Sequence, residues 1–352
     1  MDTIQKRVRA FVKLGDFLSQ FSRDGIQQKE AIEHNKLFFD GFKHQLKIAE
    51  ENNSWFTKEN ILFALESWSN ALTTVHLKKW VSETKQAQEE KTVAIVMAGN
   101  IPLVGFHDFL AVLISGHAVL VKQSSNDKHL LPFLAKYLEY AEPSLKSKIV
   151  FTESKLTDFD AVIATGSNNT ARYFEYYFKD KPTIIRKSRN SVAVLTGNET
   201  EQQLSALAED VFRYYGLGCR NVSKLFVPKD YNFDGFFTGM YDWNPIINQA
   251  KYANNYDYNK AVYLMSEFDL LENGFLMIKE DPSYASPIAT VFYEYYDSTQ
   301  ALQQKLEADN EKIQCIVAHN FSNTEVQFGE TQNPRLWNYA DDVDTIAFLL
   351  KI

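Results

Sequence analysis

Cys219 is the residue of this chain whose surroundings best suit chemistry. It lies in the stretch YYGLGCRNV, residues 214–222, where it directly follows two closely spaced glycines. A predicted helix, 204–215, precedes Cys219, and an apolar predicted strand, 222–227, follows it. Glycines let the backbone bend between helix and strand and leave room for a substrate to approach. The thiolate is the nucleophilic form of cysteine, so the turn must also favour ionisation, to which Arg220 could contribute.

The alternative for any cysteine is a small apolar side chain packed inside the protein. Cys315, the other of the two cysteines, lies within the apolar run 313–318, which is a predicted buried strand. We therefore expect Cys315 to be structural. For Cys219, the choice between packing and catalysis depends on what the rest of the chain places around it.

The bulk composition indicates a globular protein with two packed domains, or with one large domain and an extension. The chain has 352 residues, more than one hydrophobic core usually organises, with 45% hydrophobic and 23% charged residues. A net charge of -8 disfavours a nucleic-acid partner. Nothing resembles a secretory signal, and no apolar run approaches the roughly 20 residues of a membrane span. We therefore expect a cytoplasmic protein without a membrane span.

The first part of the chain, residues 1–90, has the pattern of a helical region. Apolar residues recur at helical spacing over 4–21, over 29–48 and again after Thr57, which suits a helix N-cap. The polar stretch 86–91 is expected to be a linker or a helix end.

From residue 92, short apolar runs alternate with helices of about ten residues, which predicts a parallel sheet with crossover helices. Such sheets bind ligands at the carboxyl ends of their strands. The predicted strands are 92–98, 118–122, 149–151 and 159–164, and the predicted helices are 106–115, 130–140 and 171–178.

Three polar turns follow strands of this predicted sheet. They are GNIP with Asn100, KQSS from Lys122 to Ser125, and TGSNNT over 165–170. At such turns the amino ends of helices face a bound ligand. The turns are therefore the candidate ligand-binding segments.

Beyond residue 183 the pattern predicts a second, less regular α/β region. A basic turn, 186–189, separates the predicted strands 183–185 and 192–195, and a long helix, 199–215, leads into the Cys219 turn. Further strands are expected at 222–227, 290–295 and 313–318, and further helices at 297–309 and 266–271.

In this order, the pieces resemble the aldehyde dehydrogenase superfamily and, within it, the LuxC-type acyl-CoA reductases, over residues 90–320. The motifs GNIP, VLVKQSS, TGS and GLGC carry the resemblance. It implies an aldehyde-dehydrogenase-like α/β fold, with a parallel Rossmann-like NAD(P)-binding domain, 91–197, and a second α/β catalytic domain, 198–325. The helical region 1–90 is then expected to pack on the cofactor domain, with 326–352 as a C-terminal segment.

The resemblance assigns the catalytic roles to two residues. Cys219 falls on the family's nucleophile, and Asn100 falls on the asparagine whose amide helps bind an oxyanion. An amide N–H from Asn100 and the backbone N–H of Cys219 could stabilise the charge that forms when a thiolate attacks a thioester. The alternative for Asn100 is an N-cap of the helix after it.

The resemblance assigns the cofactor to the other two turns. Lys122 falls on the lysine that contacts the cofactor ribose, and Ser124 and Ser125 follow it in the same turn. Gly166 and Ser167 fall on the turn that holds the cofactor pyrophosphate, where a helix amino end offers N–H groups to phosphate. The alternatives are a solvated lysine at a strand end and an ordinary turn.

Departures from the family pattern narrow the expected reaction. Hydrolytic members carry a glutamate that activates water, whereas the matching segment 185–190, IRKSRN, has no carboxylate, so release of an acid is not expected. Ser125 replaces the acid that binds the adenosine ribose. This removes repulsion against a 2′-phosphate and favours NADPH, with NADH still allowed. Ser283 likewise replaces an acid in the family's Glu-x-x-Gly-Pro loop, of which Ser286-Pro287 keeps the end.

Two further features have open roles. His107, at the start of a predicted helix, could donate a proton to the leaving group, although a surface histidine is the commoner case. Arg186, Lys187 and Arg189 could meet CoA or cofactor phosphates, but a solvated basic turn is favoured. No spacing of histidine, cysteine or acidic residues suggests a metal site.

Together, the residues and the resemblance predict NAD(P)H-dependent reduction of a fatty acyl thioester, either acyl-CoA or acyl-protein, to the aldehyde through a thioacyl group on Cys219. The alternatives are a CoA-acylating aldehyde dehydrogenase in the oxidising direction, a cofactor-free acyltransferase, and a non-catalytic subunit of an acyl-processing complex. The resemblance also implies a homo-oligomer and allows an acyl-transferring partner protein.

Overall fold

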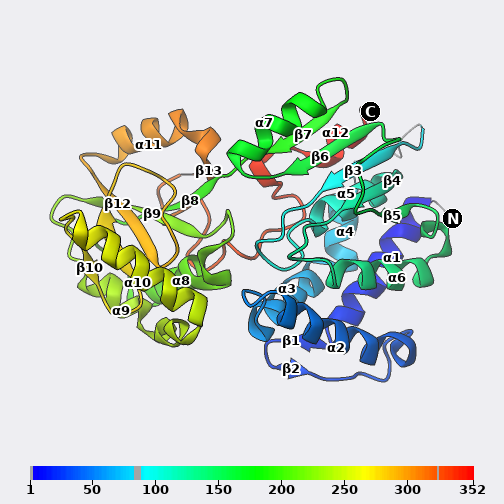
Figure 1. Ribbon diagram of the computed structural model, residues 1–352, viewed down its shortest axis with the longest axis horizontal. Helices are drawn as coiled ribbons and strands as arrows, with labels where there is room; N and C mark the ends of the chain where they lie inside the picture. The colour runs from blue at the N-terminus through cyan, green and yellow to red at the C-terminus, as the bar shows by residue number, and fades with distance from the viewer. Residues whose placement is uncertain (1–2, 83–88, 323–324) are drawn as a thin grey trace. The chain divides into compact units, whose positions relative to one another are not determined.

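The computed structural model describes residues 3–82, 89–322 and 325–352, and the chain divides into two compact units (Figure 1). The first unit is Met1–Lys187 with Arg335–Ile352, and the second is Ser188–Pro334. The division falls ten residues before the predicted 197/198 boundary, and the C-terminal segment returns to the first unit. Residues 86–88 of the predicted linker, 86–91, lie outside the described residues.

The first unit is built on a five-stranded, fully parallel sheet of order β5-β4-β3-β6-β7. This confirms the predicted Rossmann-like sheet with crossover helices. The strands are β3 (Thr92–Val96), β4 (Ala118–Lys122), β5 (Ile149–Phe151), β6 (Ala161–Thr165) and β7 (Thr183–Arg186), and the crossover helices are α5 (Phe106–Ser115), α6 (Leu130–Ala141) and α7 (Asn168–Tyr177).

The strand order reverses between β3 and β6, which is the switch point at which such sheets bind ligands. In the sheet register, Val96 at the end of β3 pairs with Lys122 on one side and Ala164 on the other. The chain therefore leaves β3, β4 and β6 at one edge, so the three predicted turns begin side by side.

The N-terminal region packs on one face of this sheet, and α7 covers the other (Figure 1). Thr57 caps its helix as predicted, since its side chain accepts a hydrogen bond from the Asn60 N–H. The second predicted helix begins at Asn35 rather than at residue 29, after a left-handed residue at His34 (φ 65°). The elements are α1 (Thr3–Leu18), β1 (Phe21–Ser22), β2 (Gly25–Ile26), α2 (Asn35–Asn52), α3 (Lys58–Ala71) and α4 (Thr74–Trp80), joined by α12 (Thr345–Leu349) from the C-terminal segment.

The second unit holds a six-stranded sheet of order β10-β11-β12-β9-β8-β13, in which only the edge strand β10 is antiparallel. Helices α8, α9 and α10 lie on one side of the sheet and α11 on the other (Figure 1). The elements are β8 (Asn190–Val194), α8 (Glu201–Phe212), β9 (Val222–Pro228), α9 (Asp234–Met240), α10 (Ala250–Met265), β10 (Leu271–Glu272), β11 (Met277–Glu280), β12 (Thr290–Tyr296), α11 (Thr299–Ala308) and β13 (Ile313–Val317).

The predicted helix over 266–271 is wrong. The structure has the helix α10 immediately before it, and the chain turns into β10 by Leu271. The buried side of α10 is formed by Tyr252, Tyr256 and Asn259, while tyrosine and aliphatic side chains also occupy its exposed side. Apolar residues therefore surround the helix, which hides the one-sided pattern that predicts an amphipathic helix.

Short 3₁₀ segments complete the secondary structure: η1 (Pro143–Leu145), η2 (Arg213–Gly216), η3 (Tyr241–Asn248), η4 (Asn310–Lys312) and η5 (Ala340–Asp342). Within the described ranges, no helix is long and apolar enough to cross a membrane.

Candidate active site

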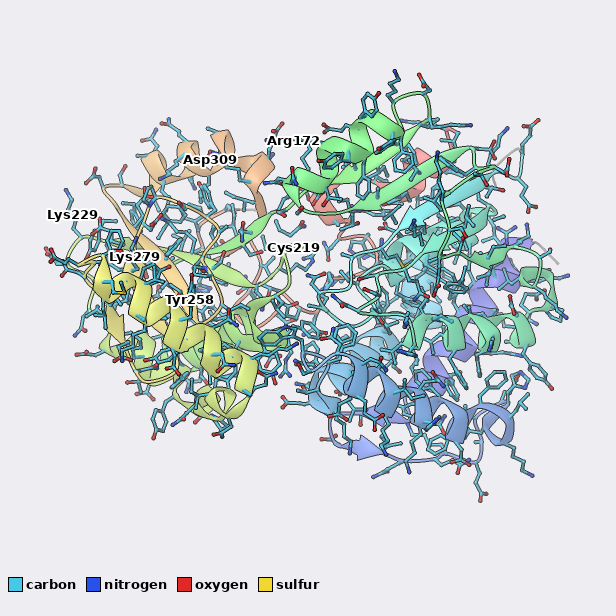
Figure 2. The ribbon with its side chains drawn as sticks, in the orientation of Figure 1. Arg172, Cys219, Lys229, Tyr258, Lys279 and Asp309 are labelled. Carbon is cyan, nitrogen blue, oxygen red and sulfur yellow. The ribbon has the colours of Figure 1, made fainter. Side chains whose placement is uncertain are left out.

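Cys219 is exposed, on a turn at the amino end of β9. Figure 2 shows it at the end of the second unit opposite to Lys229, which follows the carboxyl end of β9. The chain reaches this turn through three consecutive left-handed residues, Tyr214 (φ 55°), Tyr215 (φ 60°) and Gly216 (φ 74°). Residues other than glycine are strained in this conformation, and such backbone strain is typical of functional sites. The sharp turn places the thiol at the surface.

Two buried side chains hold the turn around Cys219. The Ser191 hydroxyl donates to the Cys219 carbonyl oxygen at 3.1 Å. Asn221 accepts a hydrogen bond from the Gly218 N–H at its Oδ1, at 2.8 Å, and its own N–H donates to the Gly218 carbonyl at 3.0 Å. Sequence reasoning missed both residues. In the sequence, the feature that could have pointed to Asn221 is its position, because it is an amide side chain two residues after the cysteine and directly before a predicted strand.

Arg220 makes a contact that the sequence did not predict. Its guanidinium donates to the Sγ of Cys315 at 3.1 Å. Cys315 is buried in β13, in keeping with the structural role expected for it. Arg220 therefore contacts the second cysteine.

In the first unit, Asn100 is exposed on the loop that follows β3. Helix α5 begins six residues later, with Gly105 in the N-cap position, so Asn100 does not cap this helix. The alternative role for Asn100 is therefore wrong, and its side chain lies on the strand-end loop where an oxyanion donor was expected.

The Asn100 loop and the turn after β4 are packed into one structure. A Cβ on Gly99 would lie 2.6 Å from both Cβ and Oγ of Ser124, so only glycine fits this approach. The Leu103 N–H donates to Oδ2 of Asp127 at 2.8 Å. The two turns that were assigned to the oxyanion and to the cofactor therefore hold each other in place.

Asp127 is buried at this junction, a position that sequence reasoning did not single out. Burial raises the pKa of its carboxyl group to about 6, an effect that the hydrogen bond from the Leu103 N–H partly offsets. Its Oδ1 is buried without a hydrogen-bond partner among the described residues. The carboxylate thus ties the loops together at an electrostatic cost.

Lys122, Ser124 and Ser125 occupy the predicted cofactor turn. Lys122 is half-buried and its Nζ donates to the Ser154 carbonyl at 3.1 Å. Oγ of Ser124 accepts from the Asn126 N–H at 3.3 Å, and Ser125 is exposed. The turn presents a cation and hydroxyl groups beside the switch point.

Gly166 and Ser167 form the turn between β6 and α7. Ser167 is the N-cap of α7, and its Oγ accepts from the Thr170 N–H at 3.2 Å. A Cβ on Gly166 would lie 3.1 Å from the Phe174 ring and from Thr170, so the turn packs closely on its helix. The amino end of α7, with its positive dipole end, lies beside the switch point.

The basic turn is not a solvated cluster. Arg186 is buried, donates from Nη2 to Oδ1 of Asp108 at 2.6 Å and also donates to the Ala340 carbonyl. The physical reason is that Asp108 lies in the first turn of α5, 78 positions before Arg186, and only the folded sheet brings the two side chains together. Lys187 is exposed and pairs with Glu175, and Arg189 donates to backbone carbonyl groups at Asn310 and Ile313.

His107 is half-buried among aromatic rings rather than at the surface. Its Nε2 lies 2.8 Å from the Leu336 carbonyl oxygen, and its ring packs near Trp80 and Tyr339. These contacts connect α5 to the returning C-terminal segment. These contacts give His107 a packing role in the first unit.

The structure resembles solved aldehyde dehydrogenases. Aldehyde dehydrogenase 21 from Physcomitrella patens aligns with a TM-score of 0.69 at 11% identity, covering 100% of this chain and 84% of that protein. A benzaldehyde dehydrogenase from Corynebacterium glutamicum aligns with a TM-score of 0.65 at 12% identity, covering 93% and 80%. A methylmalonate-semialdehyde dehydrogenase from Sinorhizobium meliloti aligns with a TM-score of 0.61 at 12% identity, covering 92% and 74%. At such low identity the likeness establishes the fold, which confirms the predicted fold class.

The sequence comparisons point to one family. A comparison with curated protein sequences finds no significant match. The family model described as acyl-CoA reductase (LuxC) matches residues 16–234, a span that includes the Asn100 loop, both cofactor turns and Cys219. Because this span is more than half of the chain, the protein belongs to the LuxC acyl-CoA reductase family.

Proposed function

We propose that this protein reduces a fatty acyl thioester to the aldehyde, with a nicotinamide cofactor and a thioacyl intermediate on Cys219. The observation that carries the proposal is an exposed cysteine on a strained, side-chain-anchored turn in a member of the LuxC acyl-CoA reductase family. Exposure lets a substrate reach the thiol, and the anchored turn keeps the reacting group in one place.

The first step needs only this chain and the thioester. The Cys219 thiolate attacks the thioester carbonyl, and a bond forms between its Sγ and the acyl carbon. The bond from that carbon to the donor sulfur then breaks, and the donor leaves as a thiol after taking up a proton. The Cys219 N–H is proposed as one oxyanion donor, and the Asn100 amide, on the family resemblance, as the other.

The carboxyl ends of β3, β4 and β6 are proposed to hold the cofactor. Lys122, Ser124 and Ser125 would contact its adenosine ribose, and Gly166 and Ser167 its pyrophosphate at the amino end of α7. The close packing at Gly99 and Gly166 supports this role, because Gly99 lets the Asn100 loop approach Ser124 and Gly166 lets its turn pack closely on α7. When bound, the cofactor supplies the hydride that converts the thioacyl group to the aldehyde.

NADPH is the proposed form of the cofactor. The exposed Ser125 leaves no carboxylate at its position to repel a 2′-phosphate. The Sinorhizobium meliloti relative is described as complexed with NAD, so a nicotinamide dinucleotide is compatible with this fold. An acyl-CoA or acyl-protein donor, a cytoplasmic location and a homo-oligomeric assembly are part of the proposal and rest on the family resemblance.

The test is NADPH oxidation, followed by its absorbance, with acyl-CoA substrates of varied chain length. Wild-type protein is expected to consume NADPH, and Cys219→Ala to lose at least about a thousandfold in rate, as a missing nucleophile does. Cys315→Ala is the matched control and should retain activity. Wild-type protein inactive with every acyl-CoA and acyl-protein thioester would refute the reductase, and turnover that survives in Cys219→Ala would refute the mechanism.

A further inference from the structure

Asn221 joins the end of helix α8 to the backbone that precedes Cys219. Its side chain is 2% exposed, and every polar atom of its amide has a partner. Nδ2 donates to the carbonyl oxygens of Arg213 at 2.8 Å and Asp210 at 3.0 Å, with Val211 at 3.4 Å. Asp210 and Val211 lie in the last turn of the helix and Arg213 is its C-cap, so these carbonyl groups lie where partners within the helix are missing.

The position of these carbonyl groups explains how the left-handed run can persist. Tyr214 and Tyr215 take a conformation that costs on the order of 1 kcal/mol or more for each non-glycine residue. The run turns the chain so sharply that the helix end faces the start of β9, where Asn221 fills the space between them. The hydrogen bonds of Asn221 offset part of the strain, since a buried bond of this kind contributes about 1 kcal/mol.

The same residue sets the orientation of the peptide group between Gly218 and Cys219. The main-chain N–H of Asn221 donates to the Gly218 carbonyl, which points that oxygen toward residue 221, and the Asn221 side-chain amide holds this main chain against the end of α8. A trans peptide is planar, with its C=O and N–H pointing in opposite directions. The Cys219 N–H is therefore directed away from Asn221. The next peptide is held as well, because the Ser191 hydroxyl donates to the Cys219 carbonyl.

We infer that Asn221 is a positioning residue that, together with Ser191, fixes the two peptide groups flanking Cys219 and so presents the Cys219 N–H to the oxyanion of the attacked thioester. This inference rests on the proposed function, which supplies the nucleophile and the thioester. Asn221 acts through the backbone and does not touch the substrate. Its loss should therefore slow steps that form an oxyanion more than steps that need only a reactive thiol.

The test compares two reactions of the same cysteine in the full-length protein without cofactor. One is acyl transfer from acyl-CoA to Cys219, measured as thioacyl-protein by mass spectrometry. The other is alkylation of Cys219 by iodoacetamide, in which the thiolate displaces iodide without forming an oxyanion. Asn221→Asp keeps the size of the side chain and the oxygen that accepts from the Gly218 N–H, but it loses the two N–H donors to the carbonyl groups at the end of α8. Ser191→Ala removes the second anchor, and Ser191→Thr restores its hydroxyl.

We expect Asn221→Asp to slow acyl transfer about a hundredfold, near the effect of losing one oxyanion donor, while alkylation stays within about threefold. Ser191→Ala should slow acyl transfer about tenfold, with recovery in Ser191→Thr. Ser223→Ala is the matched control, since the Ser223 hydroxyl also donates to a backbone carbonyl, that of Tyr284, at 2.8 Å, and should leave both rates unchanged.

Each outcome decides between the proposals. Acyl transfer that is unchanged in the variants, or that falls together with alkylation, overturns the positioning role. If Asn221→Asp does not fold, Ser191→Ala against Ser191→Thr gives the same decision. A wild-type protein that iodoacetamide alkylates but no acyl thioester acylates overturns the proposed function, and the inference with it.

Discussion

Each unit has a buried aspartate beside its proposed site, and the two carboxylates are satisfied to different degrees. Asp127, in the first unit, accepts one N–H group, from Leu103, and its other oxygen is buried without a partner in the described part of the chain. Asp210, in the second unit, accepts from the Gly329 N–H and from both the N–H and the hydroxyl of Thr331. Both carboxylates connect segments that are far apart in sequence.

The two aspartates accept different numbers of hydrogen bonds because the two proposed sites bind different groups. The turns of the first unit are proposed to bind a dinucleotide through backbone N–H groups and a helix end, and the close approach at Gly99 and one carboxylate, that of Asp127, connect two of these turns. The second unit has to hold a single thiol on a strained turn, and side chains do this work. Asp210 anchors helix α8 from one side, and Asn221 binds the Asp210 carbonyl from the other. A nucleophile thus requires more side-chain anchoring than a phosphate-binding turn.

The largest expected effect is the difference in unfolding free energy between variants that lack one or the other of the two carboxylates. Asp210→Ala would leave three buried donors unsatisfied and should lower the free energy of unfolding by about 3 kcal/mol or more, whereas Asp127→Ala leaves one and should cost about 1 kcal/mol. Urea unfolding at neutral pH, followed by circular dichroism, measures both. Equal losses in the two variants would contradict the comparison.

The two carboxyl groups should also make stability depend on pH. Burial raises the pKa of each to about 6. Because the folded protein then keeps these protons to a higher pH than the unfolded chain, the stabilisation is complete below the unfolded pKa, near 3.8, and is lost as the pH rises through 6. The free energy of unfolding should fall over this window by on the order of 2 kcal/mol for one group.

Asp127→Asn isolates one of these contributions. The variant cannot ionise at this position, so its unfolding free energy should fall less between about pH 4 and pH 6 than that of wild type. Urea unfolding at several pH values across the window provides the measurement. Parallel profiles for the two proteins would show that Asp127 does not titrate in this range.

Gly99 tests whether close backbone packing contributes to holding the Asn100 loop against the turn after β4. Gly99→Ala places a methyl group 2.6 Å from Ser124 and should push the Asn100 loop away from the cofactor turn. We expect the KM for NADPH to rise about tenfold, equivalent to about 1.4 kcal/mol. Gly235→Ala on α9 is the matched control, because its new methyl group would lie 3.5 Å from Leu204, an ordinary contact.

The smallest expected effect is on the preference for NADPH over NADH, which substitutions of Ser125 test. Ser125→Glu restores a carboxylate at the family's position and should lower kcat/KM for NADPH relative to NADH by about tenfold through charge repulsion. Ser125→Gln has nearly the same size without the charge and should change the ratio little. If the glutamine variant behaves like the glutamate variant, bulk rather than charge sets the preference.

Much of the fold follows from local patterns. Short β-branched runs such as 118–122 alternate with helices, and a parallel sheet is the arrangement that buries both faces of such strands. The left-handed run at Tyr214 and Tyr215 and the helix α10 were not predictable in the same way. Tyrosine does not favour a left-handed conformation, and the mixed faces of α10 give no clear period.

The sequence by itself determined the class of the protein, because strand-end motifs and one cysteine on a glycine turn are local features whose order survives without coordinates. Only the tertiary structure decided which polar residues hold those features in place. Arg186 was expected in solvent and is buried against Asp108, 78 positions away. Asn221 and Ser191 were not singled out and hold the backbone around Cys219. The physical reason is that a hydrogen bond depends on positions and directions in space, and distant parts of the chain acquire these only when they pack together.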